Sequence, residues 1–129
     1  MRILLDTCTF LWLQLDPRMV PESLRRVLML PDTRRYFSAA AAWEIAVKWA
    51  NGKLVLPCPP DEFVRRARAE GMIESVPVSE AAVLLVAKLP KFHNDPFDRI
   101  QISQAIDLGL ALATPDPVIR QYAVRTIWD

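Results

Sequence analysis

The sequence predicts an α/β fold, a three-layer α/β/α sandwich with a mainly parallel central sheet, and three observations support this prediction. Short apolar segments typical of buried strands alternate with helical segments along the whole chain. The chain has 129 residues, of which 52% are hydrophobic, and this is enough for one packed core. No repeat, low-complexity tract or linker-like stretch divides it. We therefore expect residues 1–129 to form a single domain, with helices on both faces of the sheet.

Five segments have the character of short strands. They are Arg2–Leu5, Arg34–Phe37, Ile73–Val78, Leu110–Ala113 and Val124–Trp128. Arg2–Leu5 and Leu110–Ala113 are almost entirely apolar, which is typical of strands buried on both faces. Helical segments separate the strands, and such crossover connections favour parallel neighbours in the sheet.

Capping residues mark where the helices begin and end. Ser38 is the expected N-cap of a helix over Ala39–Ala50, because a serine hydroxyl accepts a free backbone N–H and alanine has the highest helix propensity. Asn51-Gly52 ends that helix, and Gly71 and Gly109 are expected to end two others. The other helical segments are expected after Asp6-Thr7, from Pro21, from Asp61 to Gly71, from Ser79 to about Lys88, from Asp95-Pro96 to Gly109 and, briefly, from Asp116-Pro117.

Composition excludes several classes of function. The chain has only 3 glycines, none in a glycine-rich loop of the kind that cradles dinucleotides or nucleoside triphosphates. Its formal net charge is +1, which indicates neither a polyanion-coating protein nor an acidic solvating one. Cys8 and Cys58 match no metal-ligand spacing, and no apolar run reaches the roughly 20 residues that span a bilayer. A reducing cytoplasm is the expected location, with no role at a membrane.

Acidic side chains lie where a parallel sheet usually binds ligands, beyond the carboxyl ends of its strands. Asp6 follows the first strand and Asp116 follows the fourth, so both are expected on one rim. Each also has a purely structural interpretation, because aspartate commonly caps the helix that comes after it. Glu44 lies on an otherwise apolar helix, four residues before Lys48, and an exposed ion pair is the alternative to a functional role there.

The most distinctive segment is HNDPFDR, residues 93–99. Asp95 is expected to cap a helix whose first residue is Pro96. Capping accounts for Asp98 only in part, through its place near the positive end of the helix dipole. His93 is interpreted as a loop residue or as a neighbour of metal ligands rather than a ligand itself. Whether His93 or Asp95 contributes to a site stays open from the sequence.

The four acids together indicate metal chemistry. Neighbouring carboxylates repel one another unless protons or cations compensate them, and hard divalent cations such as Mg²⁺ and Mn²⁺ prefer oxygen ligands. These ions keep bound waters that can act as nucleophiles. A set without cysteine or paired histidine ligands points away from zinc, and the single histidine makes a Ser-His-Asp mechanism hard to build.

Short motifs follow one another from Ile3 to about Asp116. They are Leu4-Leu5-Asp6-Thr7, Ser38-Ala39 with Trp43-Glu44-Ile45-Ala46, Gly52-Lys53-Leu54, the HNDPFDR segment and Thr114-Pro115-Asp116. In combination and order they resemble PIN-domain proteins of the VapC toxin type. The resemblance implies a compact α/β/α domain, a Mg²⁺- or Mn²⁺-dependent endoribonuclease activity, and inhibition by a small cognate antitoxin in a toxin–antitoxin operon.

The resemblance also implies the site residues. The family's four acids correspond to Asp6, Glu44, Asp98 and Asp116 of this chain. We expect Asp6 and Asp98 to hold the principal ion, and the other two acids to complete the site directly or through water. Many relatives carry His or Asn where this chain has Cys8, a departure that leaves all four acids in place.

An RNA substrate needs positive charge outside the acidic centre. The candidates are Lys48, Lys53, Arg99, Arg34 and Arg35, with Trp12, Trp49 or Phe97 for base stacking. Solvated surface charge and core packing are the alternatives for these side chains. The apolar runs Phe10–Leu13 and Val27–Leu30 are candidates for binding an antitoxin helix or a second copy of the chain, so a homodimer is expected.

Two other functions stay open. One is a phosphatase with an aspartate nucleophile, but such enzymes commonly carry a second aspartate two positions later, where this chain has Cys8. The other is a catalytically silent PIN-like module that binds RNA or protein. Cleavage of single-stranded RNA with Mg²⁺ or Mn²⁺, tested with and without EDTA, distinguishes the nuclease from the silent module.

Overall fold

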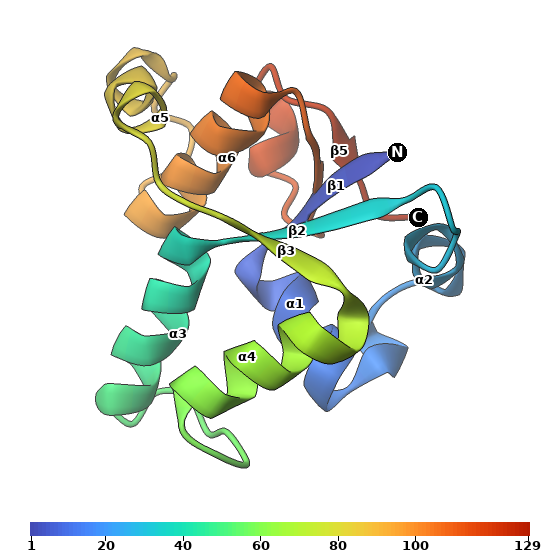
Figure 1. The fold of residues 1–129 in the computed structure, drawn as a ribbon. Helices are drawn as coiled ribbons and strands as arrows, with labels where there is room; N and C mark the ends of the chain where they lie inside the picture. Colours follow the sequence, from blue (N-terminus) through green and yellow to red (C-terminus); the bar gives the residue numbers. More distant parts are fainter.

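A computed structural model describes residues 1–129 and shows a five-stranded parallel sheet with helices on both faces (Figure 1). The strands are β1 (Arg2–Leu5), β2 (Arg34–Ser38), β3 (Ile73–Val76), β4 (Ala111–Ala113) and β5 (Thr126–Ile127). Their order in the sheet is β3-β2-β1-β4-β5. Every neighbouring pair is parallel, so the predicted α/β fold is confirmed and the sheet is wholly rather than mainly parallel.

Six α-helices and three short 3₁₀-helices connect the strands. They are α1 (Thr7–Leu15), η1 (Pro17–Met19), α2 (Glu22–Leu28), α3 (Ala39–Ala50), α4 (Pro60–Gly71), α5 (Glu80–Leu85), η2 (Val86–Lys88), α6 (Pro96–Leu108) and η3 (Ile119–Gln121). Helix α3 has the predicted bounds, because the Ser38 hydroxyl accepts a hydrogen bond from Ala40 N at 3.0 Å. None of these helices combines the length and the apolar character that crossing a membrane requires.

Two apolar clusters, one on each face of the sheet, form the core. Strand β1 contributes to both, because successive side chains of a strand point to opposite faces. Ile3 and Leu5 pack with side chains of α1, α2, α3 and α4, whereas Leu4 packs with Ile102 of α6 and Leu112 of β4. In Figure 1, α1 and α4 lie on one side of the sheet and α5 and α6 on the other. The predicted three-layer arrangement follows from this division.

The strand ends that precede the predicted site residues adjoin one another. Leu5, the last residue of β1, lies in register beside Phe37 of β2 and Ala113 of β4. The backbone N–H of Asp6 donates to Ala113 O at 3.1 Å, so the chain segments that leave β1 and β4 run side by side. The strand order also reverses here, since β2 and β3 lie on one side of β1 and β4 and β5 on the other. Open parallel sheets form their binding crevices at such a switch point.

Several predicted element ends are wrong by a few residues, for local reasons. Strand β3 ends at Val76 rather than Val78, because Pro77 has no backbone N–H to give to the ladder. The helix expected from Asp116-Pro117 is replaced by a turn, and helical residues begin only at Ile119. Strands β4 and β5 are also shorter than expected.

Gly71, one of the three glycines predicted to end a helix, does so without a left-handed conformation of its own. Helix α4 ends at Gly71, but the residue in the left-handed conformation is Met72, with φ of 49°. A Cβ atom on Gly71 would lie 3.0 Å from Ile73 Cδ1, so this glycine serves close packing rather than a positive φ. Gly109, with φ of 67°, ends α6 as predicted.

Candidate metal and catalytic site

The four predicted acids line one pocket of about 370 Å³ beside the ends of β1 and β4. The residues that line it are Asp6, Thr7, Cys8, Leu11, Glu44, Lys48, Asp95, Asp98, Pro115 and Asp116. Five carboxyl groups therefore face a single ammonium group in the pocket wall. A larger groove of about 640 Å³ is lined only by Ala, Val, Ile, Pro, Phe and Trp residues and offers no group for acid–base or metal chemistry.

Asp6 is fixed by the start of α1. Its Oδ1 accepts a hydrogen bond from Thr9 N at 2.8 Å, so the capping interpretation is correct, and the same side chain also lines the pocket. Burial raises the pKa of Asp6 above its ordinary value. Hydrogen bonds with Thr114 and Thr9 lower the pKa and offset the effect of burial only in part. The ionised form of Asp6 is thus poorly compensated by the protein alone.

Glu44 is buried and held from two sides. Thr7 Oγ1 donates to Glu44 Oε1 at 2.6 Å, and Lys48 Nζ donates to Glu44 Oε2 at 2.7 Å. Thr7 Oγ1 in turn accepts from Gln101 Nε2 at 3.2 Å, which connects α1 and α3 to α6. The expected pair with Lys48 is present, but only the lysine end is exposed: the side chain of Glu44 is 5% exposed and that of Lys48 is 46% exposed. The pair therefore forms part of the pocket wall rather than of a solvated helix face.

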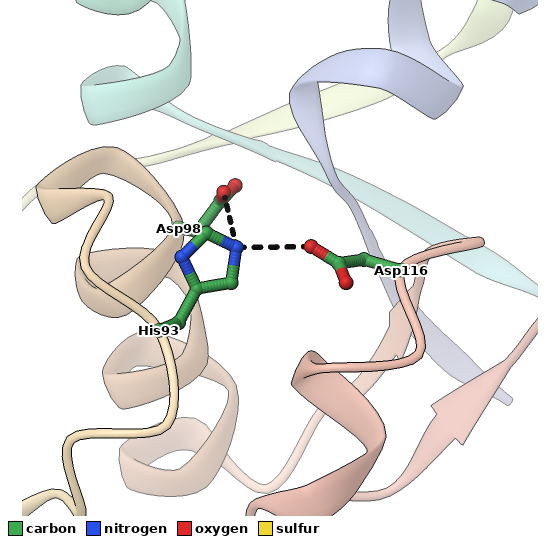
Figure 2. A group of neighbouring side chains, drawn as sticks. All are labelled: His93, Asp98 and Asp116. Carbon is green, nitrogen blue, oxygen red and sulfur yellow. Dashed lines mark hydrogen bonds and ion pairs between the residues drawn. The ribbon is translucent and has the colours of Figure 1, made fainter.

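His93 lies between Asp98 and Asp116 (Figure 2). Its Nε2 is 3.1 Å from Asp98 Oδ2 and 2.9 Å from Asp116 Oδ2. Atoms of these three side chains that can bind a metal lie within 4.8 Å of one another. Asp98 comes from the first turn of α6, Asp116 from the segment after β4, and His93 from the loop before α6. The sequence left the part played by His93 open, and the structure brings it into contact with two of the predicted acids.

The electrostatics of the pocket fit a hard cation. The pKa of Asp98 is raised to about 7, first by burial and then by the negative charge of Asp95, while His93 opposes the rise. A nearby positive charge stabilises the ionised form of carboxyl groups whose pKa is raised in this way. The donors are carboxylate oxygens, which suit Mg²⁺ or Mn²⁺ better than zinc with its cysteine and histidine sets.

Comparison with known proteins identifies the family. The PIN domain profile matches residues 3–125, which is almost the entire chain. This chain belongs to the PIN domain family. A search of curated proteins finds no significant match. PIN domains of the VapC type are usually nucleases, and the acidic pocket of this PIN domain lies beside the central strands where the sheet topology places a site.

Solved structures share the fold of this PIN domain along its length. VapBC2 from Rickettsia felis, bound to a DNA fragment from its promoter, matches with a TM-score of 0.75 and 14% identity over 100% of both chains. DNA-bound VapBC from Salmonella typhimurium gives 0.69 and 15% identity over 98% of this chain and 97% of that chain. FitAcB from Neisseria gonorrhoeae gives 0.62 and 22% identity over 97% and 96%, respectively. The TM-scores and the coverage establish a common fold at these low identities.

Arg99 of this PIN domain, a predicted RNA contact, is engaged with the protein itself. Its Nη1 donates to Pro90 O at 2.8 Å and its Nη2 to Val86 O at 3.0 Å. Nη1 also donates to Tyr122 Oη at 3.2 Å, and this hydroxyl accepts a hydrogen bond from His93 N at 2.8 Å. The guanidinium group therefore holds the loop that carries His93 against α6, which is a structural role that the sequence did not reveal.

Arg99→Ala is expected to lower the free energy of unfolding by about 2 kcal/mol, because several carbonyls lose a charged donor at once. Arg99→Lys should restore little of this, since a single ammonium group lacks the fork that reaches separated acceptors. Urea unfolding followed by circular dichroism measures the change. An Arg99→Ala protein as stable as the unaltered one would show that the loop is held by other contacts.

Of the remaining basic candidates, two lie far from the pocket and two lie in or near it. Arg34 and Arg35 begin β2, at the end of the strand away from the pocket. Arg34 forms an ion pair with Glu74 at 2.9 Å, and Arg35 donates to backbone carbonyls. These two arginines are therefore poorly placed for a substrate in the pocket. Lys48 lies in the pocket wall and Lys53 is exposed just beyond α3, so both remain candidates.

The predicted aromatic and apolar contact residues divide into buried and exposed groups. Phe10 is completely buried and belongs to the core, so it is not available to a partner. Trp12 packs against Trp128, with ring centroids 5.9 Å apart. Trp49 is 41% exposed and Met29 is 79% exposed, so these side chains are free to contact another molecule.

Cys8 lines the pocket as a neutral thiol. Burial raises its pKa to about 12, and the negative charges of Asp6 and Asp98 add to the rise. A cysteine nucleophile needs a lowered pKa, so Cys8 is unsuited to that role in the metal-free protein. Cys8 and Cys58 are both free.

The contribution of Asp98 to the stability of the metal-free protein should fall as pH rises from about 4 to about 7. The folded pKa of Asp98 is raised from 3.8 to about 7, so the folded state holds the proton over this range and the unfolded state does not. A bound cation requires the ionised carboxyl group, so Mn²⁺ should raise the melting temperature more at pH 8 than at pH 5. Scanning fluorimetry with Mn²⁺ and with EDTA checks this. Equal shifts at both pH values would contradict it.

Proposed function

We propose that this PIN domain is a metal-dependent endoribonuclease that hydrolyses RNA phosphodiester bonds as the toxin of a toxin–antitoxin pair in the cytoplasm. One observation carries the proposal: five carboxyl groups and one ammonium group line a single pocket, and burial holds the pKa of Asp6 and of Asp98 above the ordinary range. A pocket lined in this way favours the binding of a divalent cation. The PIN family match and the fold shared with VapBC structures support the same activity.

In this proposal Asp6 and Asp98 hold the principal Mg²⁺ or Mn²⁺, and Asp116 and Glu44 complete the site directly or through water. When bound, the ion supplies an activated water for in-line attack and stabilises the charge on the leaving oxygen. The chain itself orients the donors. Helix α1 fixes Asp6 through a backbone N–H, and two hydrogen bonds fix Glu44.

Lys48 is the proposed contact for a phosphate group of the RNA. Its ammonium group lies in the pocket wall, is half exposed, and is held at 2.7 Å from Glu44. The hydrogen bond to Glu44 raises the pKa of Lys48, which keeps the group charged. A fixed cation beside the acidic centre reduces the repulsion between the pocket and a polyanion. Lys53 and the exposed ring of Trp49 extend this surface past the end of α3.

Cleavage of single-stranded RNA tests the activity. A mixture of unrelated single-stranded RNAs is incubated with the purified protein and Mg²⁺ or Mn²⁺, in the presence or absence of EDTA. We expect cleavage that requires the metal ion and stops when EDTA removes it. RNA that is retained by the protein but never cut would favour the silent binding module. Cleavage that is indifferent to EDTA would contradict the proposed chemistry.

A cognate antitoxin and a second copy of this chain are the proposed partners. VapBC structures are toxin–antitoxin complexes, and they share this fold over nearly the whole chain. The small reading frame next to the gene is the place to look for an antitoxin. Its product should bind the purified chain and suppress RNA cleavage. Light scattering during size-exclusion chromatography should give twice the chain mass if the homodimer forms.

A further inference from the structure

We propose that His93 is a positioning residue that holds Asp98 and Asp116 together through its Nε2–H and does not itself bind the metal ion. The inference rests on the metal site proposed above and adds a role for a residue outside the four acids. It stands on the hydrogen bonds of both ring nitrogens and on the way in which the loop around His93 is anchored.

The backbone fixes the tautomer of His93. Asp95 N donates to His93 Nδ1 at 3.1 Å, so Nδ1 presents a lone pair. A neutral imidazole with an unprotonated Nδ1 carries its proton on Nε2. That Nε2–H therefore donates to Asp116 Oδ2 at 2.9 Å, and the same nitrogen lies 3.1 Å from Asp98 Oδ2 (Figure 2). One N–H thus lies between two carboxylates that would otherwise repel each other.

The same tautomer argues against His93 as a metal ligand. A metal-bound histidine uses the lone pair of one nitrogen and usually donates the other N–H to a carboxylate or carbonyl oxygen. In His93 the pattern is reversed. Nδ1, which points away from the acids, accepts a hydrogen bond from the backbone, and Nε2, which lies between Asp98 and Asp116, carries the proton. Nε2 therefore has no lone pair for a cation, even though it lies among oxygen atoms that have one.

The backbone of the loop that carries the ring is also anchored, so the ring can set the position of the acids. His93 N donates to Tyr122 Oη at 2.8 Å, and the same hydroxyl accepts from Arg99 Nη1 at 3.2 Å. The His93 side chain is 18% exposed, so little water competes for its N–H. The two carboxyl groups belong to α6 and to the segment after β4, which are separate parts of the chain. His93 therefore fixes the separation between two elements that must both contribute to one metal site.

Calorimetric titration of the full chain with Mn²⁺ tests the inference. His93→Ala should weaken Mn²⁺ binding about 10- to 100-fold, the loss typical of removing a residue that orients metal ligands. His93→Gln, whose amide N–H can take the place of Nε2–H, should recover most of the affinity. Asn94→Ala is the matched control, because Asn94 is an exposed neighbour in the same loop, and it should bind as the unaltered protein does.

Electron spin echo spectroscopy of bound Mn²⁺ separates positioning from ligation. We expect no coupling from a directly coordinated imidazole nitrogen in the unaltered protein, and this readout needs no variant that might fail to fold. Such a coupling would overturn the inference. So would Mn²⁺ binding to a folded His93→Ala protein as tight as that to the unaltered one, a result that leaves the metal site itself standing. Failure of the unaltered protein to bind Mn²⁺ would overturn both the inference and the proposed function.

Discussion

Asp6→Asn and Asp98→Asn are each expected to lower the rate of metal-dependent RNA cleavage more than about 100-fold. Changing a residue that only orients a metal ligand typically costs about 10- to 100-fold, and changing a ligand itself should cost more. Asparagine keeps the shape of the side chain but removes the negative charge that would hold a divalent cation. At position 6 it also keeps the helix cap, so the start of α1 should be unaffected. Initial rates on single-stranded RNA with saturating Mn²⁺ measure the effect.

Asp107→Asn is the matched control for these variants. It makes the same chemical change on the same helix as Asp98, at an exposed position outside the pocket, and it should leave the rate unchanged. Asp98→Asn should be at least as stable as the unaltered metal-free protein at pH 8, because it removes a carboxyl group whose pKa burial raises to about 7. A loss of activity without a loss of stability would separate a site role from a folding defect. Full activity in both purified site variants would refute the assignment.

Phe10→Ala is expected to lower the free energy of unfolding by about 3–5 kcal/mol, the usual cost of truncating a buried aromatic side chain. Phe10 is completely buried, and its ring centroid lies 3.8 Å from that of Phe37, which is also completely buried. A loss of this size is a large part of the roughly 5–15 kcal/mol that stabilises a typical domain. Urea unfolding followed by far-ultraviolet circular dichroism measures it.

Trp43→Ala provides the comparison for the core variant. Trp43 is 64% exposed, so its removal should cost less than about 1 kcal/mol, as surface substitutions usually do. Equal losses in Phe10→Ala and Trp43→Ala would mean that the packing around β1 and α1 is not the main source of stability. Because Asp6 directly precedes α1, we also expect Phe10→Ala to weaken Mn²⁺ binding.

Local signals in the sequence predict much of the fold. Ser38 and Gly52 bracket α3 because a serine cap and a left-handed glycine act through their own backbone neighbours. The placement of Asp6 after β1 also depends only on the strand before it and the helix after it. The shortening of β3 at Pro77 was equally visible in the sequence as a residue without a ladder N–H.

The rest of the site depends on contacts between distant parts of the chain. The hydrogen bond from Gln101 to Thr7 joins residues 94 positions apart, and the contact of His93 with Asp116 spans 23. Arg99 looked like a surface cation, because no local pattern shows that a loop will fold back and present its carbonyls. Periodicity and capping describe what a segment does alone, whereas these contacts arise only when α6 packs across the sheet.

Titration of the metal-free protein with Mn²⁺, followed by calorimetry, tests most directly whether the carboxylate pocket holds a divalent cation. We predict saturable binding to the unaltered protein, loss of that binding in Asp98→Asn, and retention of it in Asp107→Asn, with all three proteins folded. This measurement needs no knowledge of the RNA target or of the antitoxin. Equal Mn²⁺ binding by the unaltered protein and Asp98→Asn, or no binding by either, would contradict the proposed metal site.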